Sequence, residues 1–165
     1  MEGEGSVLAY SEGVFNTIKL GHVLLAVVWV GGGLFVQYYA TKLSRADDVG
    51  RITAFTKDIE KAGTQYFMPA SLLVLLFGIA MVVYSPVYNF SDTWIALGLI
   101  GYAATFVTGA FFIGPTAGKL SKALATEGPE GATSQALRKR IFAISRIDQV
   151  VLTLVIADMV IKPGR

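Results

Sequence analysis

Four long apolar stretches fill most of this 165-residue chain. A helix needs about 20 apolar residues to cross the hydrocarbon of a bilayer. Lipid admits only helices and closed barrels, and these lengths suit helices. We therefore predict an all-α fold, a four-transmembrane-helix bundle that forms a single domain over residues 1–165. The helices are expected at about 15–39, 66–84, 92–114 and 134–162.

The composition agrees with a membrane protein and excludes several kinds of site. Apolar residues make up 53% of the chain, charged residues 16%, and the mean hydropathy is +0.57. That balance is unusual for a soluble globular domain. Because cysteine is absent, disulfides, thiolate metal sites, iron–sulfur clusters and covalently attached haem are excluded. The acidic amino terminus lacks a basic region before the first apolar stretch, so we expect a retained transmembrane helix there rather than a cleaved signal.

The helix boundaries and one connector carry recognisable local signals. We expect Pro69 in a first helical turn, Asp92 as an N-cap, and Thr133 or Ser134 as another cap. Gly114-Pro115 either kinks or ends the third helix. Residues 46–62 place apolar side chains on one helical face, which predicts an amphipathic cytoplasmic connecting helix, lying at the membrane surface or against the bundle.

Basic residues predict the orientation. Ten of the 14 Lys and Arg residues lie in the two long connectors, and none lies in the turn at 85–93. Positive charge accumulates on the cytoplasmic side, so we expect both connectors inside and both termini outside. These basic clusters follow from topology and do not indicate nucleic-acid binding, because aromatic residues are not interleaved with them.

Small residues recur at four-residue spacing in the third apolar stretch. They are Gly101, Thr105 and Gly109, followed by Gly114 and Gly118. Small residues at this interval allow helix backbones to approach closely in lipid. We expect helix packing within the bundle, with a homo-oligomer or another membrane partner as the alternative use of these faces.

The only histidine, His22, gives the main clue to chemistry. It lies about a turn and a half inside the first helix, and ionisable residues at such depth need a partner or a ligand. Asp158 and Met159 should lie at nearly the same level near the end of the last helix. Lys19 and Lys162 lie one turn further out on the same faces as His22 and Asp158.

Three interpretations of this group remain open. In the first, His22 hydrogen-bonds Asp158 and the lysines reach the interface, so that the group only fixes the packing of helices. In the second, His22 is an axial ligand of haem b, with Met159 as the opposite ligand. In the third, His22 and Met159 contribute to a copper site. The first of these requires no cofactor.

A second polar group is expected in the inner half of the bundle. It consists of Arg146, Asp148 and Gln149 on the fourth helix, with Gln37 on the first. Arg146 and Gln149 share a face, whereas Asp148 points elsewhere. Arg146 either reaches the cytoplasmic interface or binds a carboxylate or anionic headgroup. No catalytic triad, phosphate-binding loop or paired-carboxylate motif is present, so the sequence does not determine whether the chain is an enzyme.

Two short segments resemble a known superfamily of bacterial membrane proteins. In the first helix, His22 is followed by Trp29, Gly32 and Leu34-Phe35, and the chain closes on Met159-Val-Ile-Lys162-Pro163. The first pattern is similar to that of HemJ-type protoporphyrinogen oxidases and copper-resistance D proteins. The closing segment resembles that of a four-helix bacterial integral membrane protein family of unknown function.

The resemblance implies a bacterial plasma membrane protein and assigns two residues. In HemJ-type proteins it implies haem b on the first-helix histidine, here His22, and a carboxyl-terminal lysine, here Lys162. The oxidases carry an arginine and a further histidine where this chain has residues 35–39, Phe-Val-Gln-Tyr-Tyr. The chain also lacks the additional histidines of the copper-resistance D proteins. The resemblance therefore does not assign protoporphyrinogen oxidation or copper handling to this chain.

Together these observations predict a haem-binding or copper-binding membrane protein with a redox or cofactor-handling role. The polar residues within the fourth helix suggest a small transporter or channel as an alternative of a different class. The Gly-rich faces suggest a third, an accessory subunit of a membrane complex.

Overall fold

The computed structural model describes residues 11–44 and 49–164. All regular elements in these ranges are helical. They are α1 Glu12–Ala26, η1 Val27–Gly31, α2 Gly32–Ser44, α3 Val49–Ala62, η2 Gly63–Phe67, α4 Met68–Tyr84, α5 Thr93–Val107, η3 Thr108–Ile113, α6 Gly114–Glu127 and α7 Ala132–Ile161. The all-α prediction is confirmed.

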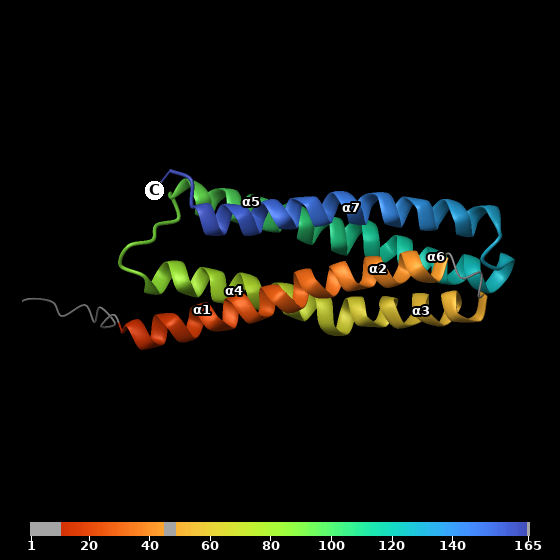
Figure 1. Cartoon of the computed structure of the whole chain (residues 1–165), viewed down its shortest axis with the longest axis horizontal. Coiled ribbons are helices and arrows are strands. Elements are labelled where there is room, and N and C mark those ends of the chain that lie inside the picture. The colour runs from red at the N-terminus through yellow and green to blue at the C-terminus, as the bar shows by residue number, and fades with distance from the viewer. Residues whose placement is uncertain (1–10, 45–48, 165) are drawn as a thin grey trace, which may run out of the picture.

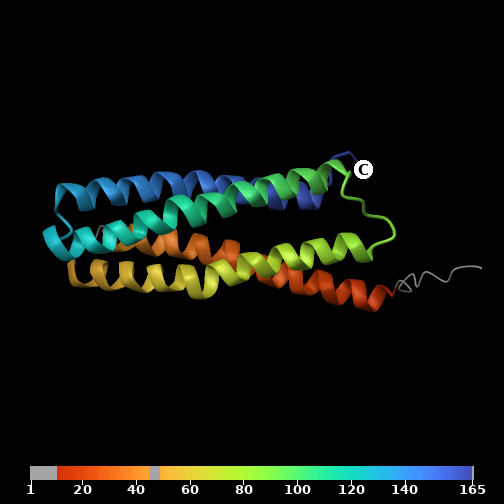
Figure 2. The same ribbon diagram turned by 180° about the vertical axis from the view of Figure 1, so that it is seen from behind.

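These elements join into four long rods (Figure 1). The segments η1, η2 and η3 are π-helical turns that continue the chain from one α-helix to the next without a break. Such turns usually occur as local bulges inside α-helices. Three rods are long and apolar enough to cross a membrane, namely Glu12–Leu43, Gly50–Tyr84 and Thr93–Glu127. The fourth, α7, carries Arg146, Asp148 and Asp158 within its apolar part and runs beside the others (Figure 2).

The rods correct several predicted boundaries. The connecting helix expected over 46–62 is not separate, because α3 continues through η2 into α4; Ala46 itself lies outside the described residues. Gly114-Pro115 does not end the third helix, since η3 leads directly into α6. Pro115 has no backbone N–H to donate, and it lies just after the π-helical turn η3, where the regular i→i−4 hydrogen-bond pattern is already interrupted.

The predicted caps have mixed outcomes. Asp92 has an extended backbone and is the N-cap of α5. Its side chain accepts a hydrogen bond from the backbone N–H of Asn89 and not from an N–H of the helix. The N-cap of α7 is Gly131, not Thr133 or Ser134. Ser134 is completely buried, and its amide donates to the Glu127 carboxylate at 2.7 Å. The side chain of Glu127 thus satisfies one of the free amides in the first turn of α7.

The two ends of the bundle differ in packing. At one end, here called the connector end, Leu43, Ile52, Leu120 and Leu124 form a buried apolar cluster that joins α2, α3 and α6. The apolar face of the predicted amphipathic helix therefore packs against the bundle. Burying a Leu or Ile side chain contributes about 1.5–3 kcal/mol.

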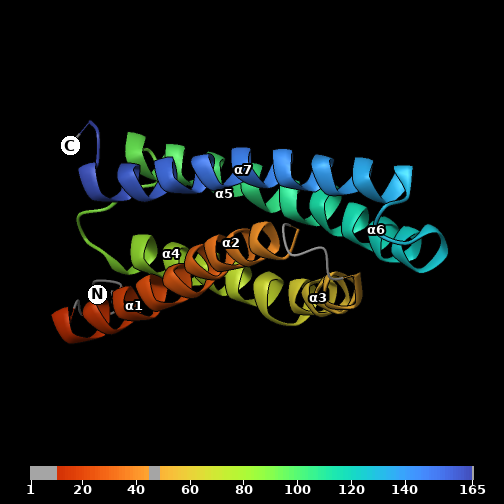
Figure 3. The same cartoon turned by 45° about the vertical axis from the view of Figure 1, so that its right-hand side comes forward.

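At the other end, here called the terminal end, α1 begins and α7 ends. There α1 packs mainly on α4, and α5 on α7. Figure 3 shows these two pairs separating toward the terminal end, where the segment between α4 and α5 passes from one to the other. Many apolar side chains on all four rods point outward, including Val27, Leu154 and Val160. Exposed apolar surface of this extent indicates contact with lipid.

Candidate functional site

The His22 ring lies in the seam between α1 and α4. Its Nδ1 is 2.9 Å from the carbonyl oxygen of Val74. Only the tautomer protonated at Nδ1 can donate to a carbonyl, so this hydrogen bond leaves Nε2 with a free lone pair. Nε2 makes no hydrogen bond with any described residue. A histidine held at one nitrogen by a backbone carbonyl and free at the other has the arrangement of a metal-ligating histidine.

Gly78 makes room for this ring. A Cβ at Gly78 would lie 3.2 Å from Cε1 of His22, closer than an ordinary contact. Because Gly78 has no side chain, the imidazole can lie close to α4 and reach the Val74 carbonyl of the same helix. Nothing in the sequence pattern of this uniformly apolar helix identified Val74 or Gly78 as partners of His22.

Met159 and Asp158 belong to the other helix pair. The Met159 methyl group packs directly over Gly98 of α5, and an Asp158 carboxylate oxygen lies near the same glycine. Val155, one turn earlier, packs in the same way over Gly101. The prediction that Gly101 mediates close helix packing agrees with this seam. Gly109, by contrast, has no neighbour within 4 Å of an added Cβ among the described residues.

The described contacts do not join His22 to Met159 or Asp158. His22 hydrogen-bonds Val74, so the predicted His22–Asp158 hydrogen bond is not formed. The two groups nevertheless lie at similar heights. The rings of Trp29 and Tyr102 are in contact, with centroids 5.6 Å apart. His22 lies seven residues outward from Trp29, and Ile95 lies seven residues outward from Tyr102. Because each residue rises about 1.5 Å along a helix, His22 and Ile95 lie at the same height. Ile95 is within one turn of Gly98, the residue that Met159 contacts.

Lys162 forms the outermost part of the site. Its ammonium donates to the Tyr88 hydroxyl at 2.9 Å and lies 4.9 Å and 5.0 Å from the ring centroids of Tyr88 and Trp94. These are favourable cation–π distances. Lys162 has a left-handed backbone, with φ of 51°, unlike every other non-glycine residue that the structure describes. Such a backbone is strained in a residue with a side chain.

Two buried polar groups lie close to this lysine without partners. The Trp94 side chain is 5% exposed, and its indole nitrogen makes no hydrogen bond. Both carboxylate oxygens of Asp158 are likewise shielded and unpaired. Lys19, the other predicted lysine, lies over the Phe15 ring of its own helix at 5.8 Å. Tyr88 and Trp94 were not predicted as site residues, because a tyrosine in a short turn and a tryptophan at a helix start give no specific signal.

The residues of the second predicted polar group do not form one cluster and lie in different surroundings. Gln37 donates to the Ser145 carbonyl at 2.7 Å and so ties α2 to α7. Gln149 is 9% exposed, its carbonyl oxygen faces Gly33, and its amide nitrogen has no partner among the described residues. Arg146 is exposed and lines a shallow hollow with Thr41 and Lys139. Asp148 points away from Arg146 and Gln149, as the helical spacing predicted, and faces α5.

The comparison with protein families identifies the chain. The family described as predicted integral membrane protein (DUF2269) matches residues 16–163. The chain belongs to this family. It is therefore a predicted integral membrane protein with several apolar helices. No curated protein and no solved structure was found to match the chain. The wider resemblance to HemJ-type and copper-resistance D proteins stays a prediction.

Proposed function

We propose that this DUF2269 protein binds haem b through Nε2 of His22, in a redox or cofactor-handling role in the bacterial plasma membrane. The observation that carries the proposal is the hydrogen bond between His22 Nδ1 and the Val74 carbonyl. It orients the imidazole and leaves one nitrogen free to bind iron. When bound, a haem b would supply one-electron redox chemistry.

The donor set favours haem over a copper ion. A metal ion held only by protein generally needs three or four ligands. Within residues 11–44 and 49–164, no group of three or more His, Asp or Glu side chains could hold a metal ion. Haem needs only axial ligands from the protein, because the porphyrin supplies the other four. One imidazole, that of His22, would be sufficient to hold the haem, and the Met159 thioether, which lies at a similar height, would be the candidate for a second ligand.

The same polar residues suit a cofactor with carboxylate groups. The Lys162 ammonium lies at the terminal end and is held by one hydroxyl and two aromatic rings rather than by a carboxylate. A cation without an acidic partner can bind an anionic group of a ligand. We assign Lys162 to the propionate side of the cofactor and Lys19 to the membrane interface. With both connectors cytoplasmic, this group faces the outer leaflet.

The test is the absorption spectrum of the purified protein. The wild type, produced with ample haem, should show a Soret band in detergent. His22→Asn should lose this band, because the Asn amide can replace Nδ1 as donor to Val74 but offers no imidazole nitrogen to iron. Val23→Ala, a change at an exposed apolar position of the same helix, should keep it. A colourless wild type, or an unchanged spectrum in His22→Asn, would exclude the proposal.

A further inference from the structure

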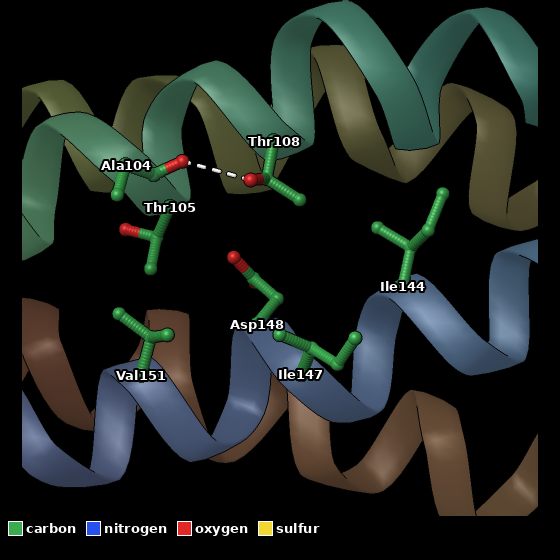
Figure 4. A pocket seen from close by; sticks show the side chains of 7 residues that line it. All are labelled: Ala104, Thr105, Thr108, Ile144, Ile147, Asp148 and Val151. Carbon is green, nitrogen blue, oxygen red and sulfur yellow. Dashed lines mark hydrogen bonds between the residues drawn. The ribbon is translucent and has the colours of Figure 1, made fainter.

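A cavity of about 140 Å³ lies between α5 and α7, away from the His22 site. Seven residues line it: Ala104, Thr105, Thr108, Ile144, Ile147, Asp148 and Val151. Figure 4 shows the Asp148 carboxyl group pointing from α7 toward the two threonines of the opposite rod. The cavity has room for several water molecules. It is apolar except for this carboxyl group and the two hydroxyls.

The hydroxyl protons in this cavity are already used. Thr108 Oγ1 donates to the Ala104 carbonyl at 2.8 Å, and Thr105 Oγ1 donates to the Tyr102 carbonyl at 3.0 Å. A hydroxyl has one proton to donate, so both threonines present only oxygen lone pairs to the cavity. Oδ1 of Asp148 is buried and accepts no hydrogen bond from any described residue. The polar atoms that face this space are therefore acceptors without a donor.

Positive charge is also missing from the walls of the cavity, since none of the seven lining residues is Lys, Arg or His. Arg146 lies two residues from Asp148 but lines the separate hollow beside Lys139. The titratable groups on the elements packed against this rod are Tyr102 on α5, whose hydroxyl lies beside Ser71 of α4, and several tyrosines and lysines and one glutamate on α2 and α6. Those of α2 and α6 are Tyr38, Tyr39, Lys42, Lys119, Lys122 and Glu127, none of which lines the cavity.

The cavity lies at membrane depth. Asp148 precedes the last residue of α7, Ile161, by 13 positions, which corresponds to about 20 Å along the helix. Bilayer hydrocarbon is about 30 Å thick. An ionised carboxylate without a counter-charge is costly at that depth, and intramembrane carboxylates commonly mark ion pathways. The cavity also borders the π-helical segment η3, which begins at Thr108, and such segments are frequent at functional sites.

We propose that Asp148, with the hydroxyl oxygens of Thr105 and Thr108, binds an exchangeable monovalent cation, either a proton or Na⁺. A proton would convert the carboxylate into a donor for these oxygens. Na⁺ would be bound by the same oxygens and by water, since hard cations take oxygen ligands. Either occupant supplies the positive charge that the cavity lacks. The site concerns a different part of the bundle from His22 and does not depend on haem binding.

A hydrophobic carbodiimide tests this assignment, because it reaches carboxyl groups from lipid and reacts with them only when they are protonated. The protein is reconstituted in nanodiscs and treated with dicyclohexylcarbodiimide at pH 5 to 9, with either Na⁺ or choline as the cation. Mass spectrometry of peptides then locates the modified residue. Asp148 should be modified, and the adduct on the peptide that contains residue 148 should be lost in Asp148→Asn but kept in Asp158→Asn.

The two cations give different results in this experiment. If Na⁺ is the occupant, Na⁺ should slow the modification about tenfold relative to choline, and Thr108→Val should weaken this protection. If the proton is the occupant, the rate should fall as pH rises and should be the same in Na⁺ and choline. An Asp148 that is unmodified even at pH 5 in choline would overturn the proposal. So would modification that neither pH nor Na⁺ changes, since the carboxyl group would then be permanently protonated.

Discussion

Nδ1 of His22 and the carbonyl oxygen of Val74 are 2.9 Å apart, so one hydrogen bond joins the first rod to the second near the terminal end. The Val74 carbonyl belongs to α4 and is buried in the seam. A side chain that donates to a helix carbonyl fixes both the tautomer of the imidazole and the direction of its second nitrogen. The same hydrogen bond thus links the two helices and leaves Nε2 without a hydrogen-bond partner among the described residues.

The packing role can be measured separately from ligand binding. His22→Ala removes the donor and should destabilise the haem-free protein by about 1 kcal/mol, the usual net contribution of one hydrogen bond. His22→Asn retains a donor at the position of Nδ1 and should unfold close to the wild type. Thermal unfolding followed by circular dichroism in one detergent compares the three proteins. Equal unfolding temperatures for His22→Ala and the wild type would show that the hydrogen bond contributes nothing to packing.

Close packing between α5 and α7 depends on Gly98. An added Cβ there would collide with the Met159 methyl group. We expect Gly98→Ala to destabilise the protein by about 1–3 kcal/mol, the usual cost of overpacking. Gly109→Ala is the matched control in the same rod, because nothing within 4 Å of the new methyl group opposes it. Unfolding temperatures that fall equally in both variants would contradict the described seam.

The buried cluster at the connector end should contribute strongly to stability. Leu120 is 5% exposed and packs with Leu43, Ile52 and Leu124. Leu120→Ala should cost about 2–5 kcal/mol, the range for a buried leucine. Leu154→Ala, at an outward-facing position of α7 that is 63% exposed, should cost much less in unfolding experiments. If the two changes were equivalent, α3 and α6 would not share a core.

The orientation inferred from the basic residues can be tested directly, because the chain contains no cysteine. Val87→Cys places a single thiol in the segment between α4 and α5, and Glu130→Cys places one between α6 and α7. With both termini outside, a membrane-impermeant maleimide added to intact spheroplasts should label the first and not the second. Breaking the membrane should expose both. The reverse pattern would invert the topology and place the His22 site at the cytoplasmic leaflet.

Hydrophobic length and periodicity predicted the helical class and the approximate start of each apolar helix. They did not predict that the rods continue past their apolar parts. The π-helical turn at η2 carries the chain onward where a break was expected, and the helix also continues through Pro115, where a kink or an end was expected. Residues 46–62 were predicted to be amphipathic, yet the partner of their apolar face could be known only from three-dimensional packing.

The sequence named His22, Met159 and Lys162 as candidates, but it indicated neither Tyr88 and Trp94 nor which residues would be in contact. Helix length and direction placed His22 and Met159 at similar heights, because rise per residue is fixed. Side-chain packing determines which helices are neighbours. Here His22 packs beside Gly78, and Met159 packs over Gly98. The depth of Asp148 was apparent from sequence. Its lack of a donor depends on the hydrogen bonds of Thr105 and Thr108, which no sequence pattern reveals.

Chemical rescue of a His22→Gly variant examines the proposed ligand role of the imidazole itself. The variant should bind no haem when purified from cells with ample haem, and adding free imidazole together with haem should restore the Soret band, because the small base can occupy the vacated space. Val23→Ala should bind haem with or without imidazole. A His22→Gly protein that binds haem equally well without imidazole, or that fails to bind it at any imidazole concentration while remaining folded, would contradict ligation by His22.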